Sequence, residues 1–272
     1  MFAAHEILQC PLCKIDINEN LRCSICGEEY VLMNDVYVLL NHKLADKEWK
    51  WDQSLFSDDK MEVMMKEYRR YLNDETKTAQ GIWWSEMNKY INSFRGIVGD
   101  IATGLGSMFE KLLKTETDFF PIATDVDPNV LGWTSTKMKE KYQKEFISVA
   151  TDARHFAFKE NTFDYLTSLA GLNNIPDTTT VLAELYRVLK KGGKLVMMHS
   201  FVEEQSKSFK LAQEFNMSTA FVERFLIEDL NQVGFKKVKA NIPSSAFWAE
   251  NPMDGLPVAG DLQYFAIIEA EK

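Results

Sequence analysis

The sequence predicts an α/β protein built on a doubly wound sheet of seven strands. From Arg95 onward, short apolar runs alternate with amphipathic stretches of helical period. Gly104 and Gly106 follow the first apolar run, where a strand gives way to a helix. The hydrophobic share of 46% and the charged share of 26% over 272 residues are typical of soluble globular proteins. In such a fold, ligands bind at the carboxyl ends of the strands.

The strands and helices of this large domain, residues 95–272, follow in regular order. Helices are expected at 107–114, 128–144 and 178–191, with two more helical stretches before the sixth strand. Pro128 begins the second helix, where its missing N–H costs nothing, and Gly192 and Gly193 are expected to end the third. The seven strands are expected at 94–101, 119–126, 144–151, 163–169, 194–201, 235–242 and 261–270.

Hydropathy indicates where in the cell the protein lies, and net charge indicates which classes of partner it binds. No apolar run approaches the roughly 20 residues needed to cross a bilayer, and the N-terminus lacks the basic start and long apolar stretch of a secretory signal. A cytoplasmic protein without a membrane partner is therefore expected. The formal net charge of -9 repels phosphate backbones, which weakens the case for a general nucleic-acid binder.

All four cysteines lie near the N-terminus, where residues 1–40 are expected to form a zinc ribbon. Two C-x-x-C pairs, separated by nine residues, can supply four thiolates to one tetrahedral ion. The predicted ligands are Cys10, Cys13, Cys23 and Cys26, and the predicted ion is structural Zn²⁺, since four protein ligands leave no open position. Gly27 suits a turn with positive φ. Disulfides are disfavoured in the cytoplasm, and residues 28–40 are expected to form a hairpin that closes the ribbon.

Residues 41–94 are expected to form a helical connector. An amphipathic helix is expected in residues 58–74, with Ser57 or Asp58 as its cap. The connector also carries Trp49, Trp51, Trp83 and Trp84. Packing is the favoured role of these aromatic side chains, and a lid over a ligand is the alternative.

The loop from Asp100 to Gly106 does not match the common phosphate-binding loops. It lacks the last glycine of a G-x-G-x-x-G loop and the lysine of a P-loop. Asp100, at the end of the strand, would repel a pyrophosphate and attract an amino-bearing ligand. This loop resembles the first motif of class I S-adenosylmethionine-dependent methyltransferases. Within that class, the sequence is similar to the methyltransferase type 11 group. The resemblance extends over residues 95–272, including the helix, double glycine and strand of residues 184–197.

The resemblance implies a binding site for S-adenosylmethionine. In this family the residue matched by Asp125 holds the two ribose hydroxyls, the one matched by Val126 covers the adenine, and the one matched by Asp152 accepts the adenine amino hydrogen. Ala102 stands where the family most often has its first glycine, so the backbone there is expected to manage without positive φ. The implied cofactor residues are Asp100, Ala102, Thr103, Gly104, Gly106, Asp125, Val126, Asp152, Ala153 and Leu169.

The methyl acceptor is less closely defined. Residues 168–177 lack the Asn/Asp-Pro-Pro-Tyr motif of methyltransferases that act on adenine or glutamine, and the large domain has no cysteine nucleophile. Oxygen, nitrogen or activated-carbon acceptors remain. Asn173 and Asn174 are candidates to orient the acceptor, and His199 is a candidate base because its pKa lies near working pH. Structural roles, as loop caps and a hydrogen-bonded histidine, are favoured for these three residues.

The order of zinc ribbon, helical connector and methyltransferase domain is similar to that of bacterial 23S ribosomal RNA guanine-N1 methyltransferases, in which the ribbon helps to recognise RNA. Here the ribbon region is acidic rather than basic. A small or medium-sized metabolite is therefore the first expectation for the acceptor. RNA guanine methylation is the alternative, and a cofactor-binding scaffold without catalysis is the second alternative. The oligomeric state is left open.

Overall fold

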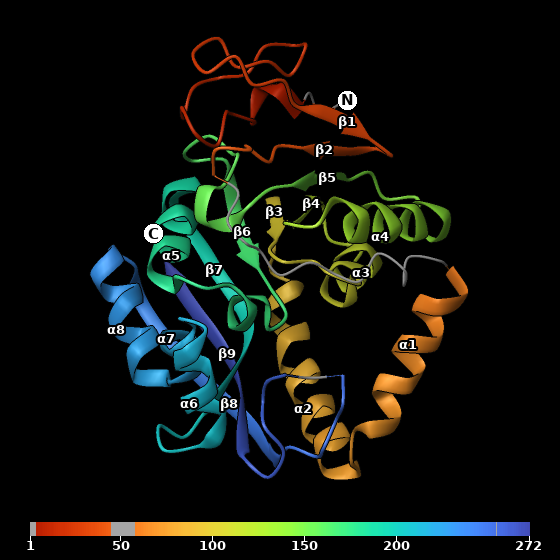
Figure 1. The fold of residues 1–272 in the computed structure, drawn as a ribbon, viewed down its shortest axis with the longest axis vertical. Coiled ribbons are helices and arrows are strands. Elements are labelled where there is room, and N and C mark those ends of the chain that lie inside the picture. Colours follow the sequence, from red (N-terminus) through yellow and green to blue (C-terminus); the bar gives the residue numbers. More distant parts are fainter. Residues whose placement is uncertain (1–3, 45–57, 254) are drawn as a thin grey trace.

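The computed structural model of the protein describes residues 4–44, 58–253 and 255–272. One twisted sheet runs through the molecule, and helices cover both of its faces (Figure 1). The predicted doubly wound α/β fold is confirmed. No helix in the described part of the chain combines the length and the apolar character needed to cross a bilayer.

The sheet has nine strands in the described residues, not the predicted seven. Its order is β1-β2-β5-β4-β3-β6-β7-β9-β8. Strands β3 to β7 are parallel to their neighbours in this group, and β9 is antiparallel to both β7 and β8. The seven predicted strands are all present as β3 (Gly96–Asp100), β4 (Phe119–Asp125), β5 (Ile147–Ala150), β6 (Phe163–Thr167), β7 (Leu189–Val202), β8 (Lys236–Phe247) and β9 (Leu262–Glu271).

The two additional strands come from the cysteine-containing N-terminal segment. Strands β1 (Val31–Met33) and β2 (Val36–Val38) form the predicted hairpin. Strand β2 then pairs in parallel with β5, with Val36 opposite Ser148 and Val38 opposite Ala150. Without this hairpin β5 would be an edge strand with unpaired backbone groups, so the N-terminal segment covers that edge and extends the sheet (Figure 1).

Two apolar clusters fill the space between the sheet and its helices. One cluster lies under α2 (Asp74–Ile91), α3 (Ser107–Lys114) and α4 (Pro128–Lys141). The other lies under the helices that follow β6 and β7, and it continues into the N-terminal segment through Leu8, Cys10 and Cys23. These remaining helices are α5 (Thr178–Val188), α6 (Lys207–Glu214), α7 (Ser218–Phe221) and α8 (Glu223–Val233), with short 3-10 turns at Ala4–Glu6, Ala153–His155 and Gly171–Asn174.

The connector contributes two helices to the described residues. Helix α1 (Asp58–Tyr71) occupies the predicted position, whereas Trp49, Trp51 and Ser57 lie outside the described residues. Trp83 on α2 is only 4% exposed, and its Nε1–H donates to the Ala266 carbonyl at 2.7 Å. Its ring lies 5.0 Å from the ring of Phe265. Trp83 therefore packs on the sheet as part of the core.

The third predicted helix ends earlier than its glycine pair suggests. Helix α5 ends at Val188, and β7 begins at Leu189. Phe163 pairs with Leu189 and Tyr165 with Lys194, so residues 190–193 bulge out of the strand. A Cβ on Gly193 would lie 2.8 Å from the Lys190 carbonyl oxygen. The double glycine therefore permits a tight bulge inside the strand rather than the end of the helix.

Candidate functional site

Three of the predicted acidic residues meet at one edge of the sheet. Asp100 ends β3, Asp125 ends β4, and Asp152 follows the end of β5 by two residues. These strands are adjacent and parallel, with Asp100 opposite Ala123 and Asp125 opposite Ala150. The next strand along the chain, β6, pairs on the other side of β3. The acids therefore lie along the carboxyl ends of β3, β4 and β5, and Asp100 flanks the switch point between β3 and β6, where such folds bind ligands.

Asp100 is the most unusual group of this edge. Its side chain is 1% exposed, and neither carboxylate oxygen has a hydrogen-bond partner among the described residues. Burial raises the pKa of Asp100 well above its usual value and outweighs the opposing effect of the nearby Thr103 hydroxyl. Its backbone is fixed, because the Asp100 carbonyl accepts hydrogen bonds from Thr124 Oγ1 at 2.8 Å and Thr103 Oγ1 at 3.1 Å. A buried carboxylate without donors is costly, so it indicates a site for a donor-bearing ligand.

Thr167 is a neighbour of Asp100 that the sequence did not single out. It is the register partner of Asp100 on β6, its side chain is fully buried, and its Oγ1 has no partner among the described residues. Paired residues of neighbouring strands point to the same face of the sheet. Two unpaired polar side chains therefore lie side by side. Only the strand register reveals this pairing, since a lone threonine in an apolar run carries no signal.

Asp125 holds the glycine loop in place. Its Oδ2 accepts the Gly104 N–H at 2.8 Å, and its Oδ1 accepts the Asp127 N–H at 3.0 Å. Burial raises the pKa of Asp125, although these two backbone hydrogen bonds favour the charged form. A carboxylate has about four lone-pair sites. Asp125 can therefore keep both backbone contacts and still accept hydrogen bonds from two hydroxyls.

Ala102 corrects an expectation about the loop backbone. Its φ is +51°, so it adopts the left-handed conformation that glycine would have supplied. This conformation costs an alanine roughly 1 kcal/mol or more. Across from it, a Cβ on Gly171 would lie 2.7 Å from the Ala102 methyl group. The glycine at 171 thus leaves the space that the alanine at 102 fills.

Thr103 and Gly106 pack the glycine loop against β4 and α4. Thr103 is 7% exposed, and its N–H donates to the Thr124 carbonyl at 2.8 Å. Gly104 and Gly106 both have positive φ. A Cβ on Gly106 would lie 2.7 Å from Thr134 Cγ2 on α4, so only glycine allows this approach.

Asp152 already has a cationic neighbour. Its Oδ2 lies 2.7 Å from the Arg154 guanidinium, and its Oδ1 accepts the Arg154 N–H at 2.8 Å. Burial acts to raise the pKa of Asp152, but the hydrogen bonds and charge of Arg154 outweigh it and keep that pKa below its usual value. Ala153 is buried beside Asp152, and Val126 and Leu169 are half-buried at the ends of β4 and β6. The role of Asp152 toward adenine remains a prediction.

The three candidate acceptor residues are engaged in contacts within the protein. Asn173 Nδ2 donates to the carbonyls of Ser200 at 3.0 Å and Ala220 at 3.3 Å. His199 is fully buried with its Nε2 hydrogen-bonded to the Ala220 carbonyl, and burial lowers its pKa to about 4. The exposed Asn174 donates to the Ala170 carbonyl at 3.0 Å. These contacts fit the favoured structural roles, and a catalytic role remains a prediction.

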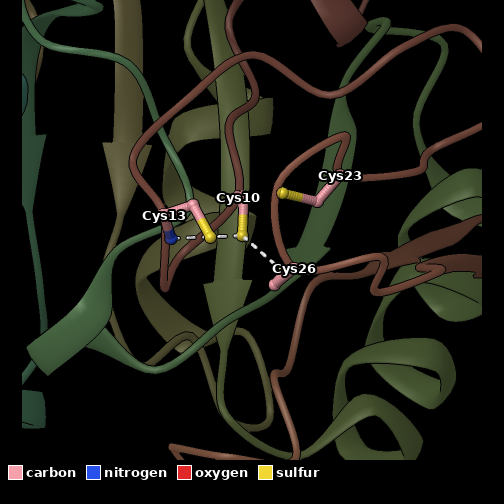
Figure 2. Close-up of side chains that lie close together, drawn as sticks. All are labelled: Cys10, Cys13, Cys23 and Cys26. Carbon is pink, nitrogen blue, oxygen red and sulfur yellow. Dashed lines mark hydrogen bonds between the residues drawn. The ribbon is translucent and has the colours of Figure 1, made fainter.

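The four cysteines form a second candidate site, in the N-terminal segment. Figure 2 shows their side chains lying together, and their sulfur atoms all lie within 4.8 Å of one another. All four are free thiols rather than disulfides. The Sγ atoms of Cys10 and Cys26 are 3.8 Å apart. This distance matches the edge of about 3.8 Å expected for a tetrahedron with zinc–sulfur bonds of about 2.3 Å.

The two cysteine pairs have the same local backbone. The Lys14 N–H donates to the Cys10 carbonyl at 2.9 Å, and the Gly27 N–H donates to the Cys23 carbonyl at 3.1 Å. The residue after each pair has positive φ, +54° at Lys14 and +75° at Gly27. The glycine turn expected after the second pair is confirmed, and Lys14 takes the same conformation in the first. Two matching turns thus point four sulfurs inward, and these residues fit a zinc ion.

Comparison with known proteins identifies similar sequences and folds. The model of the ubiE/COQ5 methyltransferase family matches residues 62–232, which is more than half of the chain. A demethylmenaquinone methyltransferase of Geobacillus sp. (strain WCH70) is 41% identical over 76 residues, 28% of this chain and 32% of that protein. The ubiquinone/menaquinone biosynthesis C-methyltransferase UbiE of Rickettsia prowazekii (strain Madrid E) is 30% identical over 122 residues, 43% of this chain and 49% of that protein. The chain thus spans between about a third and half of these relatives' lengths.

Two solved structures share the fold at low sequence identity. A putative methyltransferase from Bacillus halodurans has a TM-score of 0.55 at 16% identity, covering 69% of this chain and 97% of that one. Phosphoethanolamine N-methyltransferase 2 of Haemonchus contortus, in complex with S-adenosyl-L-methionine, has a TM-score of 0.55 at 17% identity, covering 80% of this chain and 59% of that one. These likenesses support the Rossmann-like methyltransferase fold.

The unpaired Asp100 carboxylate predicts a measurable effect of pH on stability. The pKa of Asp100 is higher in the folded protein than in the unfolded chain, where it is about 3.9. Below about pH 3.9 the carboxyl is protonated in both states and does not destabilise the fold. As pH rises from there toward the folded-state pKa, ionisation increasingly favours the unfolded chain, and the free energy of unfolding falls. Without ligand, Asp100→Asn is expected to raise the free energy of unfolding by about 1 to 3 kcal/mol at pH 7. Denaturant titrations at pH 4 and pH 7 measure the difference.

The exposed Asp118 provides the control for that comparison. Asp118→Asn is expected to change the free energy of unfolding by less than about 0.5 kcal/mol at both pH values. A wild-type protein as stable as Asp100→Asn at pH 7 would show that the carboxylate is not penalised.

Proposed function

Because the chain belongs to the ubiE/COQ5 methyltransferase family, we propose that it binds S-adenosylmethionine and transfers the methyl group to a small-molecule acceptor. The observation that carries this proposal is the buried Asp100 carboxylate, whose oxygens lack donors within the described residues. An ammonium group has three N–H donors and a positive charge, which suit such a carboxylate. When bound, the cofactor supplies a methyl group attached to a positively charged sulfur.

We assign the ends of the cofactor to the ends of the strands. Asp100 and Thr167, whose polar atoms are buried and unpaired, receive the ammonium group directly or through water. Asp125 receives the two ribose hydroxyls while it holds the N–H of Gly104. Asp152, Ala153 and Val126 line the adenine side. The protein's contribution to the reaction is then largely orientation, since an in-line displacement requires a fixed approach to the methyl group.

We infer that the acceptor is a carbon atom of an electron-rich aromatic ring, such as that of a reduced quinone precursor. The names of the relatives from Geobacillus and Rickettsia support this class, and the chain has no cysteine outside the N-terminal cluster. In this reaction the ring carbon bonds to the methyl group, the sulfur takes the electron pair, and the ring hydrogen leaves as a proton. Loss of a phenolic proton activates the ring.

The RNA alternative has less support than the small-molecule acceptor. The relatives from Geobacillus and Rickettsia are named for quinone precursors. The net charge of -9 also disfavours a phosphate backbone. A scaffold without catalysis remains the second alternative, and it is separated from an enzyme by the transfer assay described for the acceptor.

We propose that the N-terminal cysteine cluster binds one structural zinc ion as a zinc ribbon. Its support is the 3.8 Å spacing of the Cys10 and Cys26 sulfurs and the two matching turns. The Tyr30 hydroxyl lies 3.1 Å from Cys10 Sγ, and Asn41 Nδ2 lies 4.0 Å from Cys26 Sγ. Such neighbours orient thiolate ligands. Residues 1–40 are then a metal-stabilised module, residues 41–94 its connector, and residues 95–272 the methyltransferase domain.

Calorimetric titration with S-adenosylhomocysteine tests the cofactor assignment. Wild-type protein is expected to bind, and Asp125→Ala is expected to lose at least about tenfold in affinity because two hydroxyls lose their acceptor. Thr167→Val should weaken S-adenosylhomocysteine but not methylthioadenosine, which lacks the amino-acid group. Thr178→Val is the matched control, since Thr178 is also buried with an unpaired hydroxyl but lies on α5. Absence of binding by the wild type would overturn the assignment.

Transfer of labelled methyl groups tests the acceptor. Labelled S-adenosylmethionine is offered with a chemically reduced demethylated naphthoquinone or with unmodified ribosomal RNA. Label is expected in the quinol, attached to a ring carbon, and absent from the RNA. Label in the RNA would reject the small-molecule acceptor, and binding of the cofactor without transfer to either acceptor or to a metabolite extract would favour the scaffold.

Elemental analysis tests the zinc assignment. Protein purified under reducing conditions is expected to hold about one zinc ion per chain. Cys13→Ser should lower that content and the thermal stability, because the short segment depends on the metal for its stability. A metal-free wild-type protein with full stability would contradict the assignment.

A further inference from the structure

The cysteine module contacts the loop that we assign to the adenine side of the cofactor. We infer that the metal-bound module holds this loop, residues 151–158, in its binding conformation, so that loss of the metal weakens cofactor binding. The inference rests on the proposed cofactor and zinc sites and adds a coupling between them. It is carried by one contact at the start of the loop and two near its end.

The first contact lies at the start of the loop. Strand β2 of the module pairs with β5, and the pairing ends with Val38 opposite Ala150. The Leu39 N–H then donates to the Ala150 carbonyl at 2.8 Å. Ala150 is separated from Asp152 by a single residue. The module therefore fixes the backbone immediately before the acidic residue of the adenine side.

The second contact lies at the end of the loop. The Gln9 N–H donates to the Ala157 carbonyl at 2.9 Å, and the Lys159 N–H donates to the Ile7 carbonyl at 2.9 Å. Between them, Leu8 forms an isolated antiparallel bridge with Phe158. Gln9 directly precedes the ligand Cys10. The end of the loop is thus paired with the chain segment that leads into the metal site.

The third contact is made by the turn of the first cysteine pair. Lys14 directly follows Cys13, and its Nζ lies 2.7 Å from Glu184 Oε2 on α5 and 3.4 Å from the Phe156 carbonyl oxygen. Arg187, also on α5, donates to the same Phe156 carbonyl at 2.9 Å and to the Phe158 carbonyl at 2.8 Å. The loop carbonyls are therefore held between a lysine of the module and an arginine of the domain.

The metal matters because the module depends on it for its shape. A segment of about 40 residues buries too little apolar surface to be rigid alone. Gln9 and Lys14 each lie next to a predicted cysteine ligand, so the metal would fix two of the module residues that contact the loop. Cys10, Leu8 and Phe158 also share one buried cluster. Releasing the metal would loosen this cluster at the point where the loop packs.

Hydrogen exchange and calorimetry on the full chain, before and after zinc removal by a strong chelator, test the coupling. Zinc removal is expected to speed exchange in peptides covering residues 150–159 while peptides covering 96–106 keep their protection. The affinity for S-adenosylhomocysteine is expected to fall at least about tenfold, and re-added zinc should restore it.

A pair of module variants separates the contact from the metal. Lys14→Met removes the contacts to Glu184 and Phe156 but no zinc ligand, and it is expected to weaken S-adenosylhomocysteine at unchanged zinc content. Arg22→Met is the control, because Arg22 is exposed and its ion pair with Glu29 stays within the module. The control should bind as the wild type does.

The outcomes distinguish this inference from the proposals on which it rests. Unchanged exchange in residues 150–159 after zinc removal, or unchanged affinity in both zinc-free protein and Lys14→Met, would overturn the coupling. Zinc-loaded protein that binds no S-adenosylhomocysteine would instead overturn the proposed function. In that case the exchange measurement still decides whether the metal orders the loop.

Discussion

Burying the Asp100 carboxylate without a protein donor is the constraint on which the rest of the site depends. β3 is paired on both sides, by β4 and β6, so Asp100 cannot move toward water. Hydroxyls of Thr103 and Thr124 donate to its carbonyl, and the nearby Thr103 hydroxyl does not offset the burial of its carboxylate. The loop that follows takes a strained turn at Ala102. Stability is thus given up at the point where a cationic ligand group would restore it, as is common at functional sites.

The rest of the fold supports this edge from two directions. On one side, Asp125 links the end of β4 to the glycine loop and remains able to accept further hydrogen bonds. On the other side, the hairpin of the cysteine module continues the sheet beyond β5 and covers what would have been its edge. The module is therefore integrated into the sheet rather than attached by a linker alone. Under our proposal, its metal stabilises both the module and the adenine side of the site.

Local sequence patterns predicted those features whose cause is local. Apolar runs that alternate with amphipathic stretches predicted all seven strands of the large domain, and the spacing of the cysteines predicted their clustering. The end of the first of these strands located Asp100, and the family resemblance located Asp125 and Asp152. Pairings between distant segments could not be predicted in this way. The pairing of β2 with β5 joins residues more than 100 positions apart. Recognising the buried, unpaired Thr167 beside Asp100 as part of the site requires the strand register. The left-handed turn at Ala102 also depends on a tertiary contact, since Gly171 provides the space for its methyl group.

The central claim is that the Asp100 carboxylate is the partner of the cofactor's ammonium group. Its most direct test is the pKa of Asp100, followed by carbon-13 NMR of labelled aspartate carboxyl groups and assigned with Asp100→Asn. Without ligand, the pKa of Asp100 is expected to lie well above its usual value. On saturation with S-adenosylhomocysteine it should fall, because a neighbouring positive charge favours the ionised form. A pKa that stays unchanged when the ligand binds would contradict the account.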